Sequence, residues 1–159
     1  MNKARILIVE DEAIIAMELE SQLQSLGYEV TSIVDTGEKA IEKAEADKPN
    51  LILMDIRIKG DMDGIDTAIQ INSHSDIPII FLTAFADEDK INRAKLVLPF
   101  GYLLKPVQDR DLKVTIEMAV YASEVNRERN QAQEALKKTN DRLEKKLKNE
   151  QRTSKKQKK

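Results

Sequence analysis

Short apolar runs alternate with helix-patterned segments along the first 124 residues. The runs are rich in Ile, Leu and Val, and their apolar residues stand at adjacent positions, which indicates strands buried on both faces of a sheet. Five such runs occur, at residues 5–9, 29–34, 50–55, 77–82 and 99–104. A strand-helix alternation of this kind predicts a parallel sheet with helices on both faces, and right-handed crossovers make the fold doubly wound.

The segments between the runs carry apolar residues at spacings of three and four, which is the period of an amphipathic helix. Gly27 is expected to end the first helix, and Thr36 to cap the second, which ends before Pro49. The third helix is expected from about residue 64 to 73, the fourth from about Asp87, and the fifth from about Gln108. The core-facing residues predicted for the five helices are Ile15, Leu19, Leu23, Leu26, Ala40, Ile41, Ala44, Ile65, Ala68, Ile69, Ile91, Ala94, Leu98, Leu112, Ile116, Ala119 and Val120.

The composition changes near residue 124, where we place a domain boundary. Residues 125–159 carry 13 Lys and Arg against 5 Asp and Glu, whereas residues 1–124 carry 13 Lys and Arg against 23 Asp and Glu. The sequence therefore predicts an acidic domain at 1–124 and a basic helical extension at 125–159. No Pro or Gly occurs between residues 107 and 159, so the fifth helix is expected to extend to about residue 150. Residues 151–159 contain no apolar side chain and are expected to be disordered.

The extension has three interpretations. It is a solvated linker helix, a dimerising coiled coil or a nucleic-acid-binding tail. Leu136, Asn140, Leu143 and Leu147 form a short heptad-like stripe, but the matching positions upstream are polar, which makes a weak seam. Nucleic-acid binding is the least favoured, because no aromatic residue follows Tyr121 and no helix-turn-helix pattern is present.

Composition excludes several classes of protein. The chain has 159 residues and no cysteine, so a disulfide framework and a thiolate metal site are excluded. No apolar stretch approaches the roughly 20 residues of a membrane span, and the first residues lead directly into a strand-like run. We therefore expect a cytoplasmic protein without a membrane partner.

Five polar residues follow or end the apolar runs. Glu10 and Asp11 follow the first run, Asp55 ends the third, and Thr83 and Lys105 follow the fourth and fifth. Parallel strands bring their carboxyl ends to one edge, where open α/β sheets bind ligands. The acidic loop after the first run would repel the bare phosphate of a nucleotide, but it suits Mg2+, which prefers oxygen ligands. Asp55 can carry a phosphoryl group, while Lys105 and Thr83 can bind its oxygens. A cis bond between Lys105 and Pro106 would help to aim the ammonium group.

These residues resemble the receiver domain of two-component response regulators over about residues 4–122. The resemblance rests on Glu10-Asp11 after Ile-Leu-Ile-Val, Asp55 after Leu-Ile-Leu-Met, Thr83-Ala84 after Phe-Leu, and Lys105-Pro106 after Gly-Tyr102-Leu-Leu. It implies a flavodoxin-like (βα)5 fold with strand order 2-1-3-4-5. It also implies a signalling switch that is not an enzyme and that has no recognisable DNA-binding output domain.

The resemblance also assigns roles to residues. Asp55 would accept a phosphoryl group from a histidine kinase or phosphotransfer protein. Mg2+ would be held by Glu10, Asp11, Asp55 and the backbone carbonyl of Arg57, with Asp11 as the more direct ligand. Thr83 would then shift toward the phosphoryl group.

The resemblance also implies a switch at the surface of the protein. Tyr102 would rotate inward after phosphorylation and alter the face formed by the fourth helix, fifth strand and fifth helix. That face or the C-terminal helix would mediate a homodimer.

Two departures from the family pattern bear on this interpretation. The segment from Asp55 to Gly64 is one residue longer than in most receivers. The family pattern therefore supports the Arg57 carbonyl as a Mg2+ ligand less directly than it supports Asp55. Arg57 also decides against the alternative, a haloacid-dehalogenase-type Mg-dependent phosphatase. That chemistry requires an Asp as general acid two residues after the nucleophile, where this chain has Arg57.

Overall fold

A five-stranded parallel sheet forms the centre of the protein. The computed structural model describes residues 3–84, 88–95, 97 and 99–157. The strands are β1 (Arg5–Val9), β2 (Glu29–Val34), β3 (Leu51–Asp55), β4 (Ile79–Thr83) and β5 (Gly101–Leu104). They lie in the order β2-β1-β3-β4-β5, all parallel, so the flavodoxin-like doubly wound (βα)5 fold and its strand order are confirmed.

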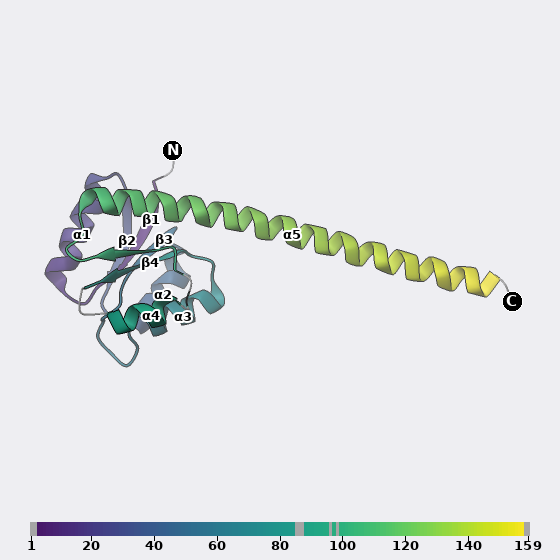
Figure 1. Cartoon of the computed structure of the whole chain (residues 1–159), viewed down its shortest axis with the longest axis horizontal. Helices are drawn as coiled ribbons and strands as arrows, with labels where there is room; N and C mark the ends of the chain where they lie inside the picture. The colour runs from purple at the N-terminus through teal and green to yellow at the C-terminus, as the bar shows by residue number, and fades with distance from the viewer. Residues whose placement is uncertain (1–2, 85–87, 96, 98, 158–159) are drawn as a thin grey trace. The chain divides into compact units, whose positions relative to one another are not determined.

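Helices cover both faces of the sheet (Figure 1). The helices are α1 (Ala13–Ser25), α2 (Gly37–Asp47), α3 (Gly64–His74), α4 (Glu88–Lys95) and α5 (Asp109–Gln157). Alternate strand residues face opposite ways and build two cores. One core joins the sheet to α2, α3 and α4, and the other joins it to α1 and α5. Strands β3 and β4 are buried throughout, and β1 is buried from Ile6 to Val9, as their continuous apolar runs predict.

The two edge strands correct one expectation. The sequence predicts burial on both faces for all five strands, but β2 and β5 each have exposed positions. Tyr102 and Leu104 are 37% and 44% exposed on β5. The reason is positional, because an edge strand has a neighbour on one side only and receives less cover from the helices.

The helix ends follow the predicted signals. The Thr36 side chain accepts a hydrogen bond from the Lys39 backbone N–H at 3.3 Å, which confirms the cap of α2. Gly27 follows α1 with a φ of +91°, a conformation that glycine adopts without the cost of a Cβ. Asp63 caps α3 through a capping box with Asp66, so Asp63-Gly64 begins a helix.

Most predicted core residues on the helices are buried or half-buried, with one error and one untested position. Ile69 is 52% exposed, and Ile71 takes its place in the core. The spacing from Ile65 and Ala68 fits either residue, and the orientation of α3 on the sheet decides between them. The predicted start of the fourth helix at Asp87 and the core position Leu98 lie outside the described residues.

Residues beyond Ser123 form a second unit. By their internal contacts the chain divides into Met1–Ser123 and Glu124–Lys159. The expected disorder from residue 151 is wrong for residues 151–157, because α5 includes them. Low hydrophobicity excludes a core but not a helix. Lys, Arg and Gln have high helix propensity, and Lys155 and Lys156 in the last turn complement the helix dipole. No helix among the described residues is long and apolar enough to cross a membrane.

Candidate functional site

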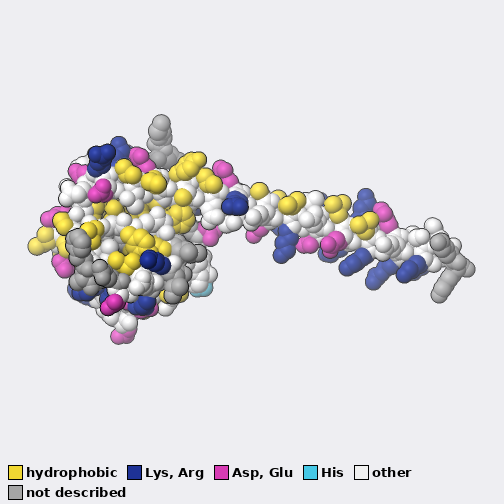
Figure 2. Space-filling model, in the orientation of Figure 1, with side chains coloured by type: hydrophobic (Ala, Val, Ile, Leu, Met, Phe, Trp, Pro, Cys, Tyr) yellow, Lys and Arg dark blue, Asp and Glu magenta, His cyan; other side chains and the backbone are white. Residues whose placement is uncertain are grey.

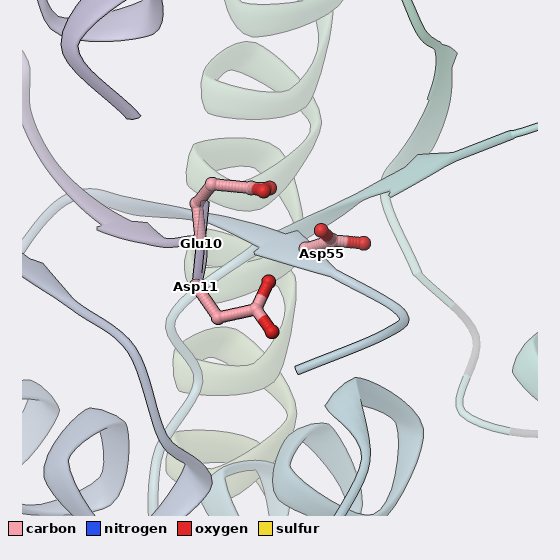
Figure 3. A group of neighbouring side chains, drawn as sticks. All are labelled: Glu10, Asp11 and Asp55. Carbon is pink, nitrogen blue, oxygen red and sulfur yellow. The ribbon is translucent and has the colours of Figure 1, made fainter. Parts of the chain in front are cut away.

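Strand register brings three carboxylates to the same edge of the sheet. Val9 pairs with Met54, so Glu10 and Asp11, which follow β1, lie beside Asp55, which ends β3. Carboxylate oxygens of the three residues lie within 4.8 Å of one another. Figure 3 shows the Glu10 and Asp11 side chains extending toward the side on which Asp55 lies. Glu10 and Asp55 are buried, at 2% and 5% exposure, while Asp11 is half-buried.

Lys105 lies against two of these carboxylates. Its Nζ is 2.6 Å from Oδ2 of Asp55 and 2.9 Å from Oε2 of Glu10. The Lys105 backbone N–H donates to the Thr83 carbonyl at 2.8 Å, which continues the β4–β5 ladder beyond the strands. The Lys105–Pro106 peptide bond is cis, as the sequence suggested.

Burial and pairing shift the protonation of this cluster. Burial, followed by the hydrogen bond with Asp55, raises the pKa of Glu10 to about 8, and Lys105 opposes this shift. Burial alone would lower the pKa of Lys105, but its hydrogen bonds to Asp55 and Glu10 raise that pKa above its ordinary value. Lys105 is therefore a cation held between two acidic groups.

The backbone around Asp55 is tightly packed. The Arg57 N–H donates to Oδ1 of Asp55 at 3.0 Å, and the Gly64 N–H donates to the Ile56 carbonyl at 2.8 Å. A Cβ at Gly64 would overlap the Asp55 carbonyl. Gly60 in the loop that follows has a φ of +99°, a conformation that glycine adopts without the cost of a Cβ. Arg57 lies two residues after Asp55, the candidate nucleophile, and so places no carboxylate at the position where a phosphatase of this type has its general acid.

Thr83 and Tyr102 lie on the neighbouring strands. Asp55 pairs with Leu82, so Thr83 stands one position beyond it on β4, and its hydroxyl donates to the Ala84 carbonyl at 3.2 Å. Thr83 is 4% exposed. Tyr102 stacks on Phe81 with ring centroids 6.2 Å apart. Tyr102 is thus exposed on β5 while its ring stacks on a core aromatic.

The structure adds positioning residues that sequence reasoning missed. Arg93 on α4 contacts both carboxylates of the α3 capping box, at 3.0 Å from Asp63 and 2.9 Å from Asp66. The Gln22 amide donates to the Val107 carbonyl at 2.9 Å, just after Lys105-Pro106. Helical spacing places these side chains on a surface, but only the tertiary fold provides their partners.

The donor set fits a hard cation. Three carboxylates supply oxygen atoms alone, and Mg2+ binds through one or two carboxylates while water completes its octahedral shell. Among the described residues, Glu10, Asp11 and Asp55 form the one cluster of this kind. Lys105 stands opposite this cluster and can meet an anion that the cation brings in.

The family follows from a direct match. Residues 6–117 match the model of the response regulator receiver domain. The chain belongs to the receiver-domain family of two-component response regulators.

Individual relatives agree with this family. The transcriptional regulatory protein PdtaR of Mycobacterium tuberculosis is 43% identical over 116 residues, which cover 73% of this chain and 56% of PdtaR. The phyllosphere-induced regulator PhyR of Methylorubrum extorquens is 31% identical over 125 residues, covering 78% of this chain and 46% of PhyR. The chain thus spans about half the length of these curated relatives.

A solved structure gives the same likeness in three dimensions. It is the signal receiver domain of a modulated diguanylate cyclase from Desulfovibrio desulfuricans G20. Its identity is 41% and its TM-score is 0.75, and the match covers 79% of this chain and 99% of that domain.

Proposed function

We propose that the protein is a phosphorylatable receiver in which Asp55 accepts the phosphoryl group. The supporting observation is the position of Oδ2 of Asp55, which lies 2.6 Å from the Lys105 ammonium and within a cluster of three carboxylates. A carboxylate is a competent nucleophile toward phosphorus, and it forms an aspartyl phosphate. The phosphodonor is a histidine kinase or a phosphotransfer protein.

Lys105 and a bound Mg2+ would together neutralise the incoming phosphoryl group. Glu10, Asp11 and Asp55, together with the Arg57 backbone carbonyl, would hold Mg2+, which would screen the repulsion between these carboxylates and the phosphoryl oxygens. Lys105 pairs with a phosphoryl oxygen once Asp55 is modified. A bound cation also favours the ionised form of Glu10, whose pKa burial raises to about 8.

Thr83 and Tyr102 are the proposed switch. The Thr83 hydroxyl now donates to a backbone carbonyl at 3.2 Å, and it turns to the phosphoryl group when that group offers a stronger, charged acceptor. Tyr102 is 37% exposed on β5, and its inward rotation would reshape the α4-β5-α5 face. Phosphorylation thereby biases an equilibrium that exists before modification. The output is a protein contact, including a homodimer through this face or through the C-terminal helix.

A small phosphodonor tests the proposal directly. Acetyl phosphate with Mg2+ is expected to phosphorylate the wild-type chain and to leave Asp55→Asn unmodified in a phosphate-affinity gel. Equal labelling of the two proteins would overturn the assignment of Asp55. The cytoplasmic location expected from the sequence stays a prediction.

The rival phosphatase function makes a different prediction. A haloacid-dehalogenase-type enzyme turns over phosphate esters and needs a general acid two residues after its nucleophile, where this chain has Arg57. We expect no turnover of p-nitrophenyl phosphate above the Asp55→Asn background. Sustained turnover by the wild type alone would favour the phosphatase.

A further inference from the structure

Gln22 joins α1 to the loop that follows β5. Long polar side chains commonly extend into solvent, as many Lys and Arg side chains along one edge of the extension do in Figure 2. The half-buried Gln22 instead uses its amide nitrogen within the protein, where Nε2 lies 2.9 Å from the Val107 carbonyl oxygen and 2.8 Å from Oδ1 of Asp109. A carbonyl and a carboxylate only accept hydrogen bonds, so both N–H groups of the amide serve as donors here.

These hydrogen bonds complete the anchoring of the loop that carries Lys105. Residues 105–108 connect β5 to α5, and the first anchor is the Lys105 N–H, which donates to the Thr83 carbonyl at 2.8 Å. Pro106 has no N–H to donate. The bond from Gln22 to the Val107 carbonyl is the second anchor, and the bond to Asp109 extends it to the first residue of α5. The backbone of Lys105 is therefore held both before and after the side chain.

Packing supports this loop incompletely on the side that faces α1. A hollow of about 560 Å3 lies there, and the residues that line it include Gln22, Lys105, Pro106 and Val107. The Val107 side chain is partly buried against the core that α1 and α5 share. Atoms that face a hollow lack van der Waals partners on that side. The Gln22 hydrogen bonds therefore supply a directional restraint that packing alone does not supply.

The position of the loop matters because Lys105 reaches the phosphoacceptor from it. Its Nζ lies 2.6 Å from Oδ2 of Asp55 and 2.9 Å from Oε2 of Glu10. In the proposed function, the same ammonium pairs with a phosphoryl oxygen once Asp55 is modified. A displacement of about 1 Å in a reacting arrangement can cost about 100-fold in rate. A loop that moves away from α1 would place the ammonium less accurately.

We propose that Gln22 is a positioning residue for phosphoryl transfer to Asp55, because it holds the Val107 carbonyl and Asp109 and thereby the backbone of Lys105. This inference rests on the proposed function of Asp55. With acetyl phosphate as donor, an Asp55 oxygen forms the new bond to phosphorus while the bond from phosphorus to the acetate oxygen breaks, and acetate leaves. Gln22 acts on this step through Lys105 and not on the reacting atoms.

Gln22→Met tests the hydrogen bonds, because methionine has a similar length and shape but no N–H donor. We expect the initial rate of phosphorylation by acetyl phosphate with Mg2+ to fall at least about threefold, which is the worth of one or two hydrogen bonds. Intact-mass spectrometry of the full chain measures the rate. Gln24→Met makes the same change at an exposed position of α1 and should leave the rate unchanged. Circular dichroism checks that each variant is folded at the assay temperature.

A donor at position 22 should rescue the rate. Gln22→Lys places an ammonium within reach of the same two acceptors, and we expect it to recover most of the rate lost in Gln22→Met. Gln24→Lys is the matched control for the added positive charge. A folded Gln22→Lys variant that is as slow as Gln22→Met would contradict the role of the hydrogen bonds.

A double-mutant cycle with Lys105→Met separates positioning from a general structural role. Asp55 and the proposed Mg2+ ligands remain in Lys105→Met, so slow transfer is followed over hours. Because Gln22 acts through Lys105, adding Gln22→Met should slow this variant little further. An equal further loss in the Lys105→Met background would show that Gln22 only docks α1 onto α5.

The remaining outcomes separate this inference from the function on which it rests. Equal rates for the wild type and Gln22→Met would overturn the positioning role and leave phosphorylation of Asp55 intact. A wild-type chain that acetyl phosphate does not modify would overturn the proposed function, and the positioning role with it.

Discussion

Lys105 makes the acidic cluster compatible with burial. Two carboxylates at 2% and 5% exposure would be costly as unpaired anions, and the Lys105 ammonium contacts both of them. Lys105 contacts Glu10 and Asp55, and the more exposed Asp11 completes the carboxylate cluster, where its oxygens can bind a cation. Glu10 and Asp11 follow β1, Asp55 ends β3, and Lys105 follows β5. The fold therefore assembles the site from three strands.

Asp11→Asn tests the role of Asp11 in metal binding. We expect the affinity for Mg2+ to fall about tenfold or more, because outer-shell changes alone cost 10- to 100-fold in metal sites. Isothermal titration calorimetry measures the affinity. Glu12→Gln is the matched control, because it removes the same charge from an exposed neighbour that makes no capping hydrogen bond. An equal loss of affinity in both variants would show that net charge, and not ligation by Asp11, attracts the cation.

Gly64→Ala tests the packing behind Asp55. Helix propensity favours Ala over Gly, but a Cβ here overlaps the Asp55 carbonyl. We expect a loss of about 1–3 kcal/mol in the free energy of unfolding, because backbone cannot yield as a flexible side chain does. Urea unfolding followed by circular dichroism measures it. A stabilised variant would contradict the close approach.

At the scale of elements, the sequence predicts the central strands and the helix ends well. All five short apolar runs became strands within two residues of the expected bounds, and Thr36 caps α2 as expected. The exposure of β5 and of Ile69 was missed, because it depends on how many neighbours a strand has and on how a helix is rotated against the sheet. Such packing is decided in three dimensions and leaves no signal in a local pattern.

The contact of Arg93 with the capping box, which joins α4 to α3, is a second feature that the local sequence pattern does not predict. Arg93 is one of several charged residues on α4, and the sequence gives no reason to single it out. In the structure its guanidinium joins Asp63 and Asp66. Burial alone would raise the pKa of Asp63, but hydrogen bonds from the Asp66 backbone and from Arg93 lower it below its ordinary value.

Arg93→Ala is expected to destabilise the protein at pH 7, and the effect should depend on pH. An Asp with a lowered folded-state pKa contributes stability above its unfolded pKa of about 3.9, and this contribution is lost as the pH falls through the folded value. The difference in free energy of unfolding between wild type and Arg93→Ala should therefore shrink below about pH 4.

Urea unfolding at several pH values measures this difference. Lys95→Ala is the control, because it removes a positive charge from the exposed last turn of the same helix. A pH-independent difference, or an equal effect of Lys95→Ala, would contradict the contact as the cause.

At the scale of the whole molecule, charge divides the chain in two. The composition shift near residue 124 coincides with the division into Met1–Ser123 and Glu124–Lys159. The assignment of a receiver at 1–124 and a basic extension at 125–159 remains our proposal. The helical course of the extension was predictable from the absence of Pro and Gly, whereas its course beyond residue 150 was not. The lack of apolar residues there predicts disorder, but helix propagation depends on helix propensity as well.

The candidate site could be predicted to a greater extent than the core packing. Its five side chains lie at strand ends, and parallel topology brings strand ends together without further information. The contact between Lys105 and Glu10 was not foreseen, because a sequence does not give side-chain direction across neighbouring strands. The position of the Arg57 carbonyl could not be predicted either, because it depends on the course of a loop that is one residue longer than in most receivers.

Phosphoryl transfer to Asp55 is the central claim, and intact-mass spectrometry of the full chain tests it most directly. The chain is incubated with acetyl phosphate in the presence of Mg2+, and in parallel with EDTA. The account predicts one phosphoryl group per chain with Mg2+, little with EDTA, and none on Asp55→Asn under either condition. Modification that is independent of Mg2+, or that persists in Asp55→Asn, would contradict it.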